Sequence, residues 1–131
     1  MSEYELIYLA SEYLNRTWSL LQFWASISFG LIAVAYFASK HLHLTMVITL
    51  TILYLAFTAF ISSIIGLNEH IVAGFMEDLA ALNTLSQGAT NLFESAPGPV
   101  MQVSIVVVYF GTCFGVLFFL WYSYILSRKN V

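Results

Sequence analysis

The side chains of this chain best suited to metal or haem binding are its three histidines. His41 and His43 lie two residues apart, and His70 follows after 27 further residues, or about 40 Å of helix. A tetrahedral zinc site needs more ligands than one close pair supplies, and His70 is out of reach of that pair. We therefore interpret all three as interfacial histidines, and we predict neither a metal site nor a cofactor.

A second candidate group surrounds His70. His70 and Glu77 are seven residues apart, so a helix would place them on one face two turns apart. General acid–base catalysis uses such groups, but no nucleophile or metal accompanies them here. We expect no enzymatic activity and interpret the group as the partner-facing acidic side of the protein: Glu69, His70, Glu77 and Asp78.

Uncharged polar residues recur at similar depth in three long apolar stretches, which contain no Asp, Glu, Lys or Arg. They are Gln22, Ser26, Ser28, Thr58, Ser62, Ser63, Gln102 and Ser104. Polar side chains in lipid bond to one another, so interhelical hydrogen bonding is the favoured interpretation. A cavity for a small molecule, a lipid or a quinone is the other. The absence of charged residues in these stretches disfavours a proton relay.

Three glycines offer sites of close helix packing. Gly66 follows Thr58 and Ser62 at four-residue steps, and Gly111 and Gly115 form a GxxxG motif. Packing within the chain's own bundle and self-association are both open interpretations of this motif.

The elements that position these residues follow from hydropathy. The chain has 131 residues, of which 60% are hydrophobic and 8% charged, and about 20 apolar residues in a helix cross the ~30 Å bilayer core. The sequence predicts an all-α membrane protein, a single domain over 1–131 with three transmembrane helices at 17–38, 44–66 and 100–126. Apolar residues at helical spacing predict two extramembrane amphipathic helices on one side, at 2–15 and 68–86.

Local signals mark the helix ends. Ser2 followed by Glu5 predicts a capping box, and the first helix can run without a break into the first span. The second amphipathic helix, which can continue directly from the second span, is predicted to end near Gly88, and Pro99 to lie in the first turn of the third span.

Charge divides cleanly between the connecting segments. All seven acidic residues precede the first span or lie between the second and third, whereas Lys40, Arg128 and Lys129 occupy the other two segments; only Arg16 breaks the pattern. The positive-inside rule then predicts a multi-pass protein of the cell membrane, an inner membrane, with its N-terminus outside and its C-terminus in the cytoplasm.

Two apolar helix faces outside the lipid need a partner surface. We therefore expect an interaction or accessory subunit of a membrane assembly, which engages a protein partner or a second copy through its acidic extracytoplasmic face and binds no nucleic acid. The three-span topology resembles that of class I phage holins, without a shared motif, and this implies the alternative of an oligomeric pore or small-solute channel. A second alternative is an interfacial enzyme or a subunit that binds lipid, quinone or haem.

Overall fold

The computed structural model describes residues 1–95 and 97–130, and all the regular structure in them is helical. The elements are α1 (Glu3–Phe37), the 3-10 turn η1 (Ser39–His41), α2 (Leu44–Ala80), α3 (Gln87–Glu94) and α4 (Pro99–Lys129). Three of them, α1, α2 and α4, are long and apolar enough to cross a membrane. The prediction of an all-α protein with three spanning helices is thus confirmed.

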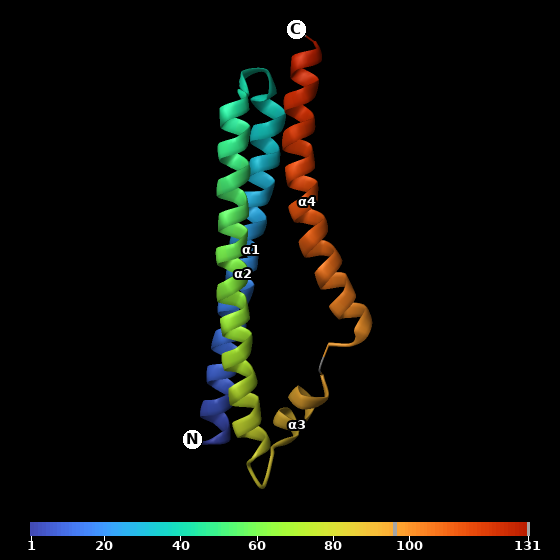
Figure 1. Cartoon of the computed structure of the whole chain (residues 1–131). Coiled ribbons are helices and arrows are strands. Elements are labelled where there is room, and N and C mark those ends of the chain that lie inside the picture. Colours follow the sequence, from blue (N-terminus) through green and yellow to red (C-terminus); the bar gives the residue numbers. More distant parts are fainter. Residues whose placement is uncertain (96, 131) are drawn as a thin grey trace.

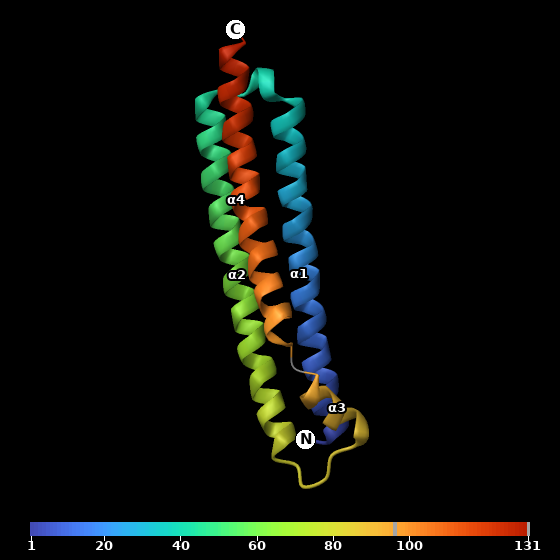
Figure 2. The same cartoon turned by 90° about the vertical axis from the view of Figure 1, so that its right-hand side faces the viewer.

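The long helices run up, down and up along one axis (Figure 1). α1 and α2 form an antiparallel hairpin through η1, and α4 runs along one side of this pair (Figure 2). The N-terminus and α3 lie at one end, which we call the acidic end because it carries all seven acidic residues. η1 and the last turns of α4 lie at the other, called the basic end after Lys40, Arg128 and Lys129.

The start of α1 forms the predicted capping box. The Ser2 hydroxyl accepts from the Glu5 N–H at 3.3 Å, and the Ser2 N–H donates to the Glu5 carboxylate at 2.8 Å. These bonds from Ser2, the backbone bond first, hold the pKa of Glu5 below its ordinary value. Pro99 occupies the first turn of α4, also as predicted, where its missing N–H costs nothing. α1 runs without a break from Glu3 to Phe37.

The helix predicted over 68–86 is too long. α2 ends at Ala80, and the unpredicted helix α3 begins at Gln87, close to where the earlier helix was expected to stop. The Ser86 hydroxyl accepts from the Ala89 N–H, so Ser86 caps a new helix instead of continuing the old one. The apolar spacing continues through the break because Leu82 and Leu85 still pack against the buried residues Leu6, Leu79 and Ala89.

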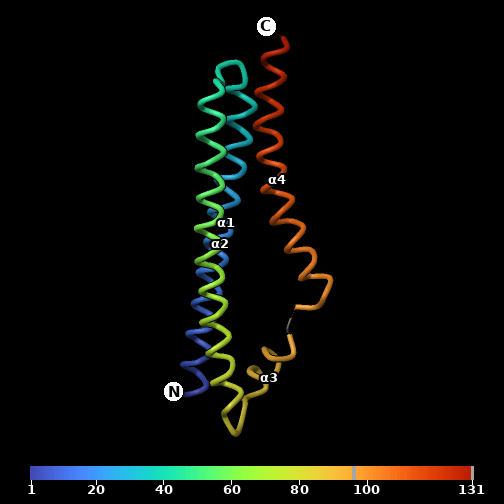
Figure 3. Tube along the Cα trace, viewed as in Figure 1, coloured from blue at the N-terminus to red at the C-terminus, as the bar shows by residue number. Residues whose placement is uncertain are grey.

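Buried residues form three clusters along the axis. Leu6, Leu79 and Ala89 lie at the acidic end, Leu31, Tyr54 and Val116 near the middle, and Ala35, Leu42, Val47 and Leu120 at the basic end. α4 supplies no buried residue before Val116, although its partly buried Cys113 also packs against the middle cluster. Its first half therefore diverges from the other two helices toward the acidic end (Figures 1 and 3).

Candidate functional site

Polar atoms bond across α1 and α2 at two levels in the middle of the bundle. The Trp24 indole N–H donates to the Thr58 hydroxyl at 3.1 Å. One helical turn further along α1, the Ser28 and Tyr54 hydroxyls lie 2.8 Å apart. All four residues are buried. They satisfy each other's polar groups where lipid offers no alternative partner.

Tyr109 attaches α4 to this group. Its ring stacks on Trp24 with centroids 4.6 Å apart and planes 23° apart. Its hydroxyl bonds to the Ser62 hydroxyl and lies 3.5 Å from the Thr58 carbonyl oxygen. We call these six residues the polar–aromatic cluster: Trp24, Ser28, Tyr54, Thr58, Ser62 and Tyr109.

The side chains of the polar–aromatic cluster are suited to hydrogen bonding between helices. Its six side chains supply hydroxyls and one indole N–H, and none is a carboxylate, an imidazole or an amine. Interhelical hydrogen bonds of this kind stabilise membrane helix contacts by about 0.6 to 2 kcal/mol each. The hydrogen bonds of the cluster therefore link α1, α2 and α4 at one level of the bundle.

Three of the eight residues predicted to form a polar layer join the cluster, namely Ser28, Thr58 and Ser62. The other five lie on exposed surface. Ser26, Ser63 and Ser104 each donate to the carbonyl four residues earlier, the Gln102 amide donates to the Pro97 carbonyl, and Gln22 contributes only its backbone carbonyl, to Ser26.

Sequence reasoning missed the aromatic members Trp24, Tyr54 and Tyr109. The available signal was that each carries a hydrogen-bonding atom at membrane depth, where such atoms need a partner. Another missed contact lies toward the acidic end, where the buried Asn68 donates to the Thr17 hydroxyl at 3.3 Å.

The packing glycines receive no neighbouring helix within the described chain. A Cβ added at Gly66, Gly111 or Gly115 would meet no heavy atom within 4 Å outside the helix's own backbone. Gly111 and Gly115 are both exposed. Any helix that packs closely on this GxxxG motif therefore comes from another molecule.

The first ten residues of α4 are all exposed. Each residue from 99 to 108 is exposed, including Val103 at 62% and Val107 at 62%. Tyr109 is the first residue of α4 that is partly buried. These ten residues are attached to the bundle through Tyr109 at their C-terminal end, and this part of α4 diverges from α1 and α2 toward the acidic end (Figure 1).

The acidic end holds α3 through one carboxylate. The Ser86 N–H lies 3.2 and 3.3 Å from the two oxygens of Glu3, and the Ser86 hydroxyl also donates to Glu3. The apolar side of α3 meets Leu6 and Leu79 through Ala89. Glu69, His70, Glu77 and Asp78, predicted to face a partner, are all exposed.

A pocket of about 650 Å³ lies between α1 and α2 near the acidic end. Its lining includes Leu20, Phe23, Ile64 and Asn68 but none of the eight predicted layer residues. A cavity lined by that layer stays a prediction.

No family model matches the chain, and neither a curated protein nor a solved structure matches it. Proposals about its function therefore depend on its own residues.

Proposed function

We propose that this protein is an accessory subunit of a membrane assembly, which binds a partner membrane protein along residues 99–108 of α4 and at its acidic end. The observation that carries the proposal is the exposure of every residue from 99 to 108. Gln102 and Ser104 lie there as well and offer polar atoms at membrane depth to a neighbouring helix.

The proposal assigns a second contact to the acidic end. α1 and α2 have 35 and 37 residues, well beyond the ~20 that cross a bilayer core. Their surplus turns, with α3, would form an amphipathic platform outside the lipid, closed by Leu6, Leu79 and Ala89. Its seven acidic residues suit a partner with a basic extramembrane segment.

The orientation belongs to the same proposal. Lys40, Arg128 and Lys129 place the basic end in the cytoplasm, and the acidic platform outside the cell membrane. Cysteines introduced next to Lys40 and at Gly88 test this, with Cys113 replaced by serine. A membrane-impermeant maleimide should label only the Gly88 site in intact cells, and label at both sites or only near Lys40 contradicts the orientation.

Site-specific photo-crosslinking in native membranes tests the docking surface. A benzophenone amino acid at Val103 or Val107 should yield one discrete protein adduct, identified by mass spectrometry. Leu53 of α2 is the matched control, because it is apolar and 60% exposed but lies on another helix. Adducts with lipid alone at Val103 and Val107, or the same protein adducts at Leu53, would overturn the proposal. An adduct with a second copy of this chain would replace the proposed different partner by self-association.

The pore alternative has one supporting observation, the open GxxxG face at Gly111 and Gly115. Against it, Ser28 and Thr58 are buried and bonded inside a single chain, so they are not free to line a shared channel. Conductance of the purified protein in planar bilayers would favour the pore over the accessory subunit.

A further inference from the structure

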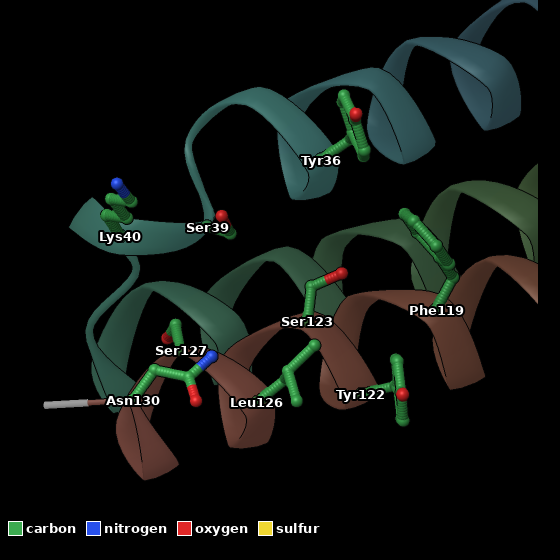
Figure 4. A pocket seen from close by; sticks show the side chains of 9 residues that line it. All are labelled: Tyr36, Ser39, Lys40, Phe119, Tyr122, Ser123, Leu126, Ser127 and Asn130. Carbon is green, nitrogen blue, oxygen red and sulfur yellow. The ribbon is translucent and has the colours of Figure 1, made fainter.

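A pocket of about 570 Å³ opens at the basic end between the end of α1, η1 and the last turns of α4 (Figure 4). None of the predicted site residues lies in it. Its lining consists of Tyr36, Ser39, Lys40, Phe119, Tyr122, Ser123, Leu126, Ser127 and Asn130.

Ser123 contributes a hydroxyl to the wall of this pocket. Only 8% of the residue is exposed, and the described residues contain no buried side-chain oxygen or nitrogen that lacks a hydrogen-bond partner. Figure 4 shows the Ser123 side chain pointing from α4 toward the end of α1. A serine hydroxyl can donate one hydrogen bond and accept others, so this wall of the pocket offers a polar contact to a ligand.

The lining changes from charged to apolar with depth. Asn130 lies at the rim, Ser123 about 10 Å deeper along α4, and Phe119 about 6 Å deeper again, at 1.5 Å per residue. On the opposite wall, Ser39 and Lys40 form the rim and Tyr36 lies one turn below them. Lys40 and Asn130 thus lie near the rim, Leu126 one turn below Asn130, Ser123 deeper and Phe119 deepest.

We propose that this pocket binds one anionic glycerophospholipid from the leaflet at the basic end. Lys40 pairs with the phosphate diester, the Ser123 hydroxyl donates to a glycerol ester oxygen, and an acyl chain lies along Phe119. Figure 4 shows the Lys40 ammonium turned away from α4, and its four-carbon stem is long enough to turn toward the rim. An anionic lipid is favoured because the charged side chains of this end are all positive: Lys40, Arg128 and Lys129.

The affinity difference follows from the charge. A lysine near an anionic lipid surface contributes about 1 kcal/mol, which corresponds to a roughly fivefold change in the dissociation constant. Lys129 carries the same charge at the same end but does not line the pocket, so Lys129→Gln is the matched control for Lys40→Gln.

The experiment titrates the delipidated full-length protein in detergent and counts bound molecules by native mass spectrometry. The three probes are dioleoyl-phosphatidylglycerol, dioleoyl-phosphatidylcholine and inorganic phosphate. We expect one phosphatidylglycerol per chain, about fivefold weaker phosphatidylcholine binding and no retained phosphate. Lys40→Gln should weaken phosphatidylglycerol binding about fivefold and Lys129→Gln less than twofold. Ser123→Leu, which fills the pocket, should abolish the bound lipid.

Three results overturn the proposal. Equal affinity for the two lipids, or equal losses in Lys40→Gln and Lys129→Gln, would show a diffuse surface effect. Retention of inorganic phosphate as tight as that of lipid would show a free-anion site. Undiminished lipid binding in Ser123→Leu would place the lipid elsewhere; if that variant does not fold, the comparison of Lys40→Gln with Lys129→Gln decides.

Discussion

Tyr109 is the residue through which the middle of α4 is attached to α1 and α2, so its replacement tests how the bundle is held. Tyr109→Phe keeps the ring stacked on Trp24 and removes the hydroxyl that bonds to Ser62. Hydrogen bonds between membrane helices contribute about 0.6 kcal/mol on average and up to about 1.7 kcal/mol. We therefore expect Tyr109→Phe to lower the free energy of unfolding by about 0.6–1.7 kcal/mol.

The ring makes a separate contribution. Aromatic pairs at such centroid distances are worth about 0.5–1.5 kcal/mol beyond the area they bury. Tyr109→Leu should therefore lower the free energy of unfolding by about 1–3 kcal/mol in total. Because Tyr109 is the first partly buried residue of α4, its loss should also separate α4 further from Trp24.

The assay is titration of the purified protein in mixed micelles with sodium dodecyl sulfate, followed by far-UV circular dichroism. A double-mutant cycle of Tyr109→Phe with Ser62→Ala isolates their mutual bond. Tyr122→Phe is the control, since it removes a hydroxyl from an exposed residue of the same helix. A coupling energy of zero, or a loss in Tyr122→Phe as large as in Tyr109→Phe, would refute the reasoning.

Three further predictions concern the ends of the bundle. Glu3→Ala should remove both bonds to Ser86 and release α3, which limited proteolysis between residues 81 and 86 would detect as faster cleavage. Because the pKa of Glu5 is lowered in the folded protein, its stabilisation of the first turn is complete above the unfolded pKa, about 4.3, and is lost as pH falls through the lower folded value. The protection factors of the first-turn amides, which correct for the intrinsic slowing of exchange in acid, should therefore fall as the pH is lowered past these values. Trp121→Phe removes the 3.2 Å bond from its indole N–H to the Thr51 hydroxyl and should lower the free energy of unfolding by about 0.6 kcal/mol.

Each of these has a control and a contrary result. Glu77→Ala, which removes an exposed acid from α2, should leave the cleavage rate unchanged. A cleavage rate in Glu3→Ala equal to that of the unsubstituted protein would contradict the proposed role of Glu3 in holding α3. Glu5→Gln should abolish the acid dependence of exchange in the first turn, and a dependence that persists would assign it to another group. For Trp121, the reference is Trp18→Phe on the exposed surface of α1; the hydrogen bond contributes nothing if both variants lose the same stability.

Local rules predicted the parts of the fold that depend on neighbours in sequence. The capping box at Ser2 and the first-turn position of Pro99 involve residues within one helical turn, so the pattern carries all the information needed. The break after Ala80 was missed because apolar periodicity reports which residues face a core and not whether the backbone between them stays helical. Leu82 and Leu85 keep that periodicity across a turn.

The candidate site was predicted less completely. Ser28, Thr58 and Ser62 were selected as polar residues at membrane depth, but so were Ser63 and Ser104, which bond to their own helices. Which serines meet another helix depends on the rotation of each helix about its axis. That rotation is set by packing between distant segments, as when Trp24 meets Thr58.

The sequence alone determined that three helices are apolar and long enough to cross a membrane and that acids and bases lie at opposite ends, because hydropathy and charge are properties of the residues themselves. Tertiary structure decided that every residue of α4 before Tyr109 is exposed and that Glu3 holds α3 through Ser86. It also decided that Ser123 faces a pocket beside Lys40. These depend on how segments up to 83 residues apart meet in space, which no local pattern encodes.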